Sequence, residues 1–336
     1  MPDKETLLSH VISRRRAVLG GLSCLAAAAA FPSHAAPYPE RAVRLLIGFT
    51  PGGGADFVGR LVAQRLSQTL GGNVVVENKA GANGTIAAAD VARSPADGYT
   101  LLLGVTASQS ISPVLMAKPP YDPTRDFTPI SMVGYTPLVL VVNPKLPVKS
   151  VAEFIAYVKA SKDPVPYGSA GVGNITHMAA ELFVQTTGAS QLRHIPYKGS
   201  GQVITDLIGG QIQAYFDTLP SSLPFIQSGQ LRALAVTGQA RSPAAPDIPT
   251  MQEAGLTDFS PTTWFGLLAP PKLDSVLVQQ VQAALQRGFS DAESRKGLTI
   301  RGVEPVLNGP AEFAVELEAD LNRWRGVTRK AGITLD

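Results

Sequence analysis

Residues 45–56 read LLIGFTPGGGAD, and this stretch decides the fold class. An apolar run typical of a buried strand ends in a glycine-rich turn, and apolar residues at helical spacing follow it, namely Phe57, Leu61, Val62 and Leu66. The first backbone N–H groups of a helix have no partner within the helix, and the helix dipole favours negative charge there. The stretch therefore predicts a strand, a tight turn and a helix whose N-terminus can hold an anion.

The same alternation of strand and helix patterns continues along the chain. We expect strands at residues 43–49, 74–77, 100–104, 138–142, 165–168, 214–217 and 231–237. We expect helices at residues 57–70, 86–93, 151–161, 175–187, 202–207, 276–289 and 311–330. Ser150 and Glu153 have the spacing of a capping box that starts one of these helices. The alternation predicts an α/β protein with mostly parallel sheets covered by helices on both faces.

Two changes of pattern indicate crossings between lobes. Loop-like sequence gives way to a new strand–helix series near residue 136, and prolines interrupt the pattern at residues 242–249. About 300 residues also exceed the usual size of a single core. We therefore expect lobe 1 at residues 36–135 and 256–336, lobe 2 at residues 136–255, and a ligand cleft between them that closes by a hinge motion.

The N-terminus has the three parts of an export signal. Arg14, Arg15 and Arg16 form a basic region, an apolar stretch covers residues 17–31, and small residues at 33 and 35 fit a cleavage site. The apolar stretch is shorter than the roughly 20 residues that span a bilayer. We expect residues 1–35 to be a signal peptide read by the Sec or the twin-arginine route, and the remaining chain to be periplasmic.

Charge and cysteine content exclude several functions. The net charge of the chain is +3, and loss of residues 1–35 removes four basic and two acidic residues, which leaves +1. Such a balance offers no electrostatic basis for binding nucleic acid or an anionic membrane. The only cysteine, Cys24, lies within residues 1–35. The remaining chain therefore has no disulfide, thiol nucleophile or thiolate metal site.

Three glycine-rich turns follow expected strands. They read TPGGG at 50–54, AGANG at 80–84 and GSAGVGN at 168–174. None matches the spacing of a dinucleotide fingerprint or ends in the Lys-Ser/Thr of a phosphate-binding loop. Asp56 in the first helical turn suits the dipole but would repel a polyphosphate. We interpret these turns as donors of N–H groups to a carboxylate, with tight strand–helix turns as the simpler alternative.

Polar side chains follow several expected strands. Thr106, Ser108 and Ser169 place hydroxyls at carboxyl ends of strands, where they could donate to a carboxylate or cap the next helix. Asp217 ends another strand and could receive a ligand ammonium or hydroxyl, or cap the turn at Thr218. Both interpretations remain open for each residue.

A hydrolase is the alternative from a different class. Ser169 with His177 and Asp217 could form a triad in space, but Tyr167 stands where a nucleophile elbow requires glycine. The two histidines outside the expected signal, His177 and His194, have no metal-site spacing. The lack of a strong catalytic constellation favours a binding protein over an enzyme.

Eight segments resemble the extracytoplasmic solute receptors of tripartite tricarboxylate transporters, also called Bug receptors. They are residues 49–56, 76–84, 96–102, 121–123, 167–169, 194–199, 249–255 and 264–267. The resemblance implies a two-lobed periplasmic-binding-protein fold of the type II class. It also implies capture of a small organic carboxylate and delivery to the membrane components of such a transporter. Our own hypothesis adds a monomeric state and no cofactor. Gln109, Ser112 and Asn174 depart from residues that are frequent in the family, so the resemblance does not identify the acid.

The glycine turns, the hydroxyls and the resemblance together give the expected ligand site. Its residues are Phe49, Pro51, Gly52, Gly53, Gly54, Asp56, Thr106, Ser108, Ser169, Gly171, Gly173, Asn174 and Asp217. We expect no catalytic residue and no metal. The alternatives are a secreted serine esterase that uses Ser169, and a ligand-sensing partner of a membrane signalling protein.

Overall fold

The computed structural model describes residues 38–331. The chain divides into a short unit, residues 1–40, and a large unit, residues 41–336, and the account below concerns the large unit. The expected signal peptide at residues 1–35 lies outside the described residues. Within residues 38–331, no helix combines the length and the apolar character needed to cross a membrane.

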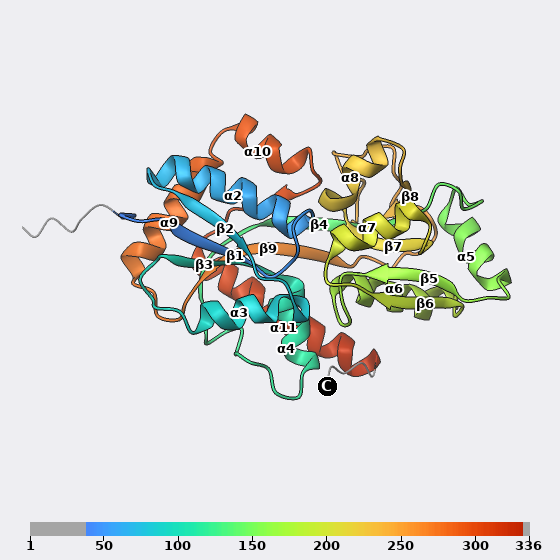
Figure 1. The fold of residues 1–336 in the computed structure, drawn as a ribbon, viewed down its shortest axis with the longest axis horizontal. Coiled ribbons are helices and arrows are strands. Elements are labelled where there is room, and N and C mark those ends of the chain that lie inside the picture. The colour runs from blue at the N-terminus through green and yellow to red at the C-terminus, as the bar shows by residue number, and fades with distance from the viewer. Residues whose placement is uncertain (1–37, 332–336) are drawn as a thin grey trace, which may run out of the picture. The chain divides into compact units, whose positions relative to one another are not determined.

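The large unit alternates strands and helices (Figure 1). The strands are β1 (Val43–Ile47), β2 (Val74–Asn78), β3 (Thr100–Val105), β4 (Thr128–Val142), β5 (Val165–Ser169), β6 (Leu192–Pro196), β7 (Ala214–Thr218), β8 (Arg232–Val236), β9 (Thr262–Ala269) and β10 (Glu304–Pro305). The helices are α2 (Gly54–Leu70), η1 (Ala82–Gly84), α3 (Thr85–Ala92), η2 (Ala107–Ile111), α4 (Ser112–Leu115), α5 (Val151–Ala160), α6 (Ile175–Thr187), α7 (Ser200–Gly209), α8 (Leu219–Gln227), α9 (Ser275–Gly288), α10 (Ala292–Thr299) and α11 (Pro310–Ala331).

One long strand, β4, links the two halves of the sheet. The strand order is β2-β1-β3-β9-β4-β7-β5-β6. Up to Pro137, β4 pairs with β9, and from Leu138 onward it pairs with β7 and β8. We call the part built on β1, β2, β3, β9 and β10 lobe 1, and the part built on β5, β6, β7 and β8 lobe 2. The residue boundaries expected at 136 and 255 stay a prediction.

The expectation of mostly parallel sheets is only half correct. Strand β1 is parallel to β2 and β3, and β5 is parallel to β6 and β7. However, β4 is antiparallel to β7, β8, β9 and β10, and β9 is antiparallel to β3. The chain passes from lobe 1 to lobe 2 along β4, and it has returned to lobe 1 when it forms β9. The sequence pattern of these strands does not show whether they run parallel or antiparallel to their neighbours.

Helices cover both faces of the sheet in lobe 1. Alternate residues of a strand point to opposite faces. On one face, Gly59 of α2 lies so close to Ile47 of β1 that a Cβ at this glycine would come within 2.3 Å of the Ile47 side chain. On the other face, Leu46 packs in a cluster with Trp264 of β9 and Phe313 of α11. Figure 1 shows α2 and α3 on opposite sides of β1.

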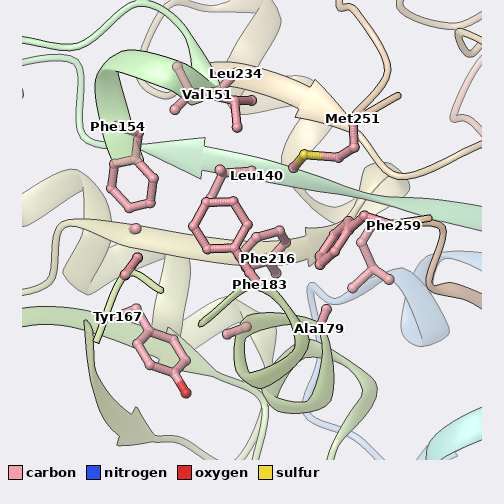
Figure 2. Close-up of a cluster of buried hydrophobic side chains, with 14 of the residues drawn as sticks. Leu140, Val151, Phe154, Tyr167, Ala179, Phe183, Phe216, Leu234, Met251 and Phe259 are labelled. Carbon is pink, nitrogen blue, oxygen red and sulfur yellow. The ribbon is translucent and has the colours of Figure 1, made fainter. Parts of the chain in front are cut away.

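Lobe 2 follows the same rule through β4. Leu140 belongs to a cluster with Phe154 of α5 and Phe183 of α6, which Figure 2 shows. The neighbouring residue Val141 belongs to a separate cluster with Leu207 of α7 and other side chains of α7 and α8. All of these side chains are almost fully buried. Burial on both sides of β4 explains why residues 138–142 form an unbroken apolar run.

The loop-like sequence that precedes residue 136 includes Thr128 and Pro129, but in the structure residues 128–137 form the first part of β4. Pro129 and Pro137 are unusual residues for a strand, because proline cannot donate a hydrogen bond to a sheet. The register of the β4–β9 pair shifts between Pro129 and Ser131 and again between Met132 and Gly134. These irregularities accommodate the first proline and explain why the pattern looked loop-like.

Candidate functional site

A small cavity of about 40 Å³ lies between the ends of strands and helices from both lobes. Its lining includes no ionisable side chain among the described residues. Phe49 and Phe265 provide aromatic walls. The remaining lining residues are Gly53, Gly54, Ala55, Val105, Ala107, Ala170, Asn174, Ile175, Thr176, Ser200, Thr218 and Thr263. Of the thirteen residues expected at the ligand site, this cavity brings together Phe49, Gly53, Gly54 and Asn174.

Helix N-termini from both lobes surround the cavity. Helix α2 begins after Gly53 and α7 begins at Ser200, after the glycine N-cap at 199. Neither N-cap makes a side-chain hydrogen bond. Helices α6 and α8 begin after Asn174 and Thr218, which also line the cavity. The positive ends of four helix dipoles therefore face one small space, and no side chain of residues 38–331 that lines it is charged.

Asp56 stabilises the first glycine turn through hydrogen bonds to its carboxylate. Its carboxylate accepts hydrogen bonds from Gly52 N at 3.1 Å, Arg60 Nε at 3.0 Å and Asn78 Nδ2 at 2.9 Å. Burial opposes ionisation, but these donors together lower the pKa of Asp56 below its usual value. Because Asp56 uses the Gly52 N–H, that group is occupied within the turn. Pro51 and Gly52 are exposed and do not line the cavity.

The expected hydroxyls of Thr106 and Ser108 do not line the cavity. Thr106 Oγ1 accepts a hydrogen bond from Trp264 N at 3.1 Å, and its side chain is fully buried. Ser108 Oγ donates to Val105 O at 3.2 Å. Both hydroxyls therefore make hydrogen bonds within the protein that fix the connection between β3 and η2. The neighbouring residues Val105 and Ala107 line the cavity instead. Direct contact of either hydroxyl with a ligand stays a prediction.

Ser169 lies in a buried aromatic cluster behind the third glycine turn. Its Oγ lies 2.5 Å from His194 Nε2 and accepts a hydrogen bond from Gly171 N at 3.1 Å. The His194 ring stacks on the His177 ring with 4.0 Å between centroids. Ser169 is fully buried, and neither it nor Gly171 nor Gly173 lines the 40 Å³ cavity. The Ser169 hydroxyl thus stabilises the third glycine turn. A nucleophile must be accessible to its substrate, so this buried position does not suit one.

Asp217 lies in a second buried polar network. Its carboxylate accepts hydrogen bonds from Ser200 Oγ at 2.9 Å and from Ser222 Oγ at 2.7 Å. Ser200 Oγ also lies 2.7 Å from the hydroxyl of Tyr215. Burial raises the pKa of Asp217 above its usual value although the serine hydroxyls oppose this shift. Asp217 is fully buried and does not line the cavity, but its hydrogen-bond partner Ser200 does.

The histidine cluster gives the first testable prediction. Burial, and to a lesser extent the neighbouring His177, lowers the pKa of His194 from its usual value of about 6.5 to about 4. The unfolded chain therefore binds more protons than the folded chain between these two values. We expect the free energy of unfolding to fall by up to about 3 kcal/mol as the pH decreases from 6.5 to 4. Denaturant unfolding across this pH range measures it.

A His194→Gln variant provides the control for that prediction. Glutamine cannot titrate, so the variant should show a shallower dependence of unfolding free energy on pH over the same range. An identical slope in the variant and the parent would mean that His194 does not cause the effect.

Most of the cavity lining was missed by the sequence interpretation. Ser200 could have been found, because it follows the glycine at 199 and lies just before the expected helix at 202–207. Thr218 follows Asp217 and was named only as part of a turn. The apolar side chains Val105, Ile175 and Phe265 carry no signal that separates a cavity wall from a core. Within the described residues, no group of three or more His, Cys, Asp or Glu side chains could hold a metal ion.

Comparisons with known proteins agree with this architecture. The family model described as tripartite tricarboxylate transporter family receptor matches residues 58–333. Protein BugT of Bordetella pertussis is 37% identical over 325 residues, which covers 96% of this chain and 99% of BugT. The solved periplasmic binding protein BugD has a TM-score of 0.84 at 34% identity and covers 88% of this chain and 99% of its own. Rpa4515 of R. palustris, solved with adipate, has a TM-score of 0.85 at 35% identity, with the same coverage of both chains.

The fold is thus the two-lobed α/β fold of a type II periplasmic binding protein, with a ligand cleft between the lobes. The class of protein is a solute-binding receptor. The chain belongs to the tripartite tricarboxylate transporter receptor family.

Proposed function

We propose that this chain is a periplasmic receptor that binds a small organic carboxylate in the 40 Å³ cavity and delivers it to the membrane components of a tripartite tricarboxylate-type transporter. The observation that carries the proposal is the set of four helix N-termini around a cavity without charged side chains. A carboxylate there would receive backbone N–H donors and the favourable ends of four dipoles. The relative solved with adipate supports this class of ligand.

The size of the cavity supports a role for domain movement. A volume of 40 Å³ corresponds to about three water molecules, which is room for one carboxylate group. The remainder of a solute needs space that a hinge movement of the lobes would provide. Affinity would then come from preorganised donors in a site from which water is largely excluded.

The esterase alternative has less support. A nucleophilic serine must reach its substrate, but Ser169 is fully buried and its hydroxyl is engaged by His194 and Gly171. Its geometric partner is His194, whereas the expected triad used His177. Asp217 belongs to a different network. A sensory role would use the same ligand site, and loss of solute uptake on gene deletion separates transport from signalling.

A thermal-shift screen tests the proposed function. The protein without residues 1–35 would be screened against mono-, di- and tricarboxylates, amino acids and aromatic acids, before and after unfolding and refolding to remove co-purified solute. We expect one class of acid to raise the midpoint, because a ligand that binds only the folded state stabilises it by mass action. The amide of the same acid is the matched control and should cause no shift. Equal shifts with the acid and its amide would contradict carboxylate recognition.

A further inference from the structure

The two lobes contact each other through a hydrogen bond between residues that do not line the 40 Å³ cavity. Asn83 lies in η1 of lobe 1, and Val172 lies in the turn between β5 and α6 of lobe 2. Asn83 Nδ2 donates a hydrogen bond to Val172 O at 2.5 Å. The Asn83 side chain is nearly buried, with 9% exposed. The two residues belong to different lobes, so this bond exists only while the lobes are together.

The backbone on each side of the contact is specialised for close approach. Asn83 has φ of 56°, in the left-handed region that asparagine tolerates better than most residues. Gly171 has φ of 140°, and a Cβ there would lie 2.4 Å from Asn83 Oδ1. Glycine at 171 therefore lets the Asn83 amide lie directly against the Gly171–Val172 peptide.

The partner of Asn83 fixes the orientation of its side-chain amide. Val172 O can only accept a hydrogen bond, so the donor Nδ2 of Asn83 must face it and the acceptor Oδ1 must point away. Oδ1 is then buried with no hydrogen-bond partner among the described residues. The contact gains one hydrogen bond and leaves one acceptor unsatisfied, whereas water satisfies both atoms when the lobes separate. Its net stabilisation is small, which suits a contact that forms and breaks during each binding cycle.

The Asn83–Val172 hydrogen bond fixes the turn between β5 and α6, and this turn extends to the 40 Å³ cavity. Asn174, at the end of this turn, lines the cavity and its N–H donates to Gly171 O at 3.1 Å. On the lobe 2 side, Gly173 N donates to His177 Nδ1 at 3.1 Å and Gly171 N donates to Ser169 Oγ at 3.1 Å. Asn83 is the partner of this turn from lobe 1. It does not line the 40 Å³ cavity, but together with Gly171 and Val172 it borders a second cavity of about 330 Å³.

We propose that Asn83 is a positioning residue that latches the lobes in the closed state by binding the Gly171–Val172 peptide. The latch favours closure and fixes the turn that carries Asn174. The consequence for binding rests on the proposed function, but the latch itself can be measured with no solute present.

Distances between spin labels test the latch. The mature chain has no cysteine, so Lys159→Cys on α5 of lobe 2 and Gln279→Cys on α9 of lobe 1, both exposed, give one label on each lobe. We expect Asn83→Ala to reduce the ratio of closed to open molecules roughly threefold to tenfold, which is the range for loss of one hydrogen bond. Asn83→Asp should reduce the ratio further, because it places an oxygen against Val172 O.

Controls separate a latch from a general structural role. Asn322→Ala, at an exposed asparagine of α11, should leave the distance distribution unchanged. The thermal midpoint of Asn83→Ala should stay close to that of the parent while the distances change. Gly171→Ala should open the lobes as well, and the Asn83→Ala/Gly171→Ala pair should open them no more than Gly171→Ala alone. Identical distributions for the parent, Asn83→Ala and Asn83→Asp would overturn the proposal, whatever solute the protein binds.

Discussion

Gly53→Asp should abolish binding of the carboxylate while leaving the fold intact. Gly53 is the N-cap of α2 and lines the cavity, with φ of −86° and ψ of 171°, a conformation that any residue adopts. Aspartate is a favourable N-cap residue, so the variant should be as stable as the parent or slightly more stable. Its carboxylate would occupy the place proposed for the ligand anion. Two like charges about 4 Å apart near a protein surface repel by about 4 kcal/mol.

The expected loss of affinity is therefore at least about 100-fold. Isothermal titration with the acid identified by the thermal-shift screen measures it, and circular dichroism checks the fold. Gly53→Asn is the matched control, because asparagine has nearly the same shape and also caps helices but has no charge. It should retain most of the binding that Gly53→Asp loses. If folded Gly53→Asp binds as tightly as the parent, the anion site is not at this turn.

Asp217→Asn should strongly destabilise lobe 2. Asp217 accepts from Ser200 Oγ and Ser222 Oγ through its two different oxygens, and it is fully buried. Asparagine keeps one acceptor, but its NH₂ group is a donor, so the second hydroxyl must accept from it and the proton that this hydroxyl gave to Asp217 loses its buried acceptor. We expect the free energy of unfolding to fall by about 2–4 kcal/mol in denaturant titrations. Asp258→Asn, at an exposed aspartate, should change it by less than about 0.5 kcal/mol.

The same variant tests how Asp217 affects the ligand. If Asp217 acts through Ser200, Asp217→Asn should weaken binding of an amino acid and of its analogue without the ammonium group by the same factor. A selective loss for the amino acid would instead show that Asp217 contacts the ligand ammonium directly, which is one of the two interpretations that the sequence left open. An unchanged unfolding free energy would contradict the buried network.

The glycine turns and the helical periodicity were sufficient to predict the fold class. The expected helix at 175–187 matches α6, and Ser150 Oγ accepts a hydrogen bond from Glu153 N at 3.1 Å, as half of a capping box requires. The other half differs, because Glu153 accepts from Lys149 N. The first part of β4 was missed because its prolines mask a strand whose pairing depends on β9, more than 100 residues later.

The ligand site was predicted less completely, for a physical reason. Turn glycines are visible in sequence because their function is a backbone property. The direction of a hydroxyl depends on partners far along the chain. Thr106 is held by Trp264 N, 158 residues away, and Ser169 by His194, 25 residues away. No local pattern could show that these hydroxyls are engaged by the protein itself.

The most direct test of the central claim is a crystal structure of residues 36–336 with the carboxylate selected by the thermal-shift screen. The account predicts one ligand carboxylate in the cavity, with its oxygens within hydrogen-bond distance of the first backbone N–H groups of α2, α6, α7 or α8. Phe49 and Phe265 should contact the carbon chain. A ligand bound elsewhere, or one whose carboxylate points away from these helix N-termini, would contradict it.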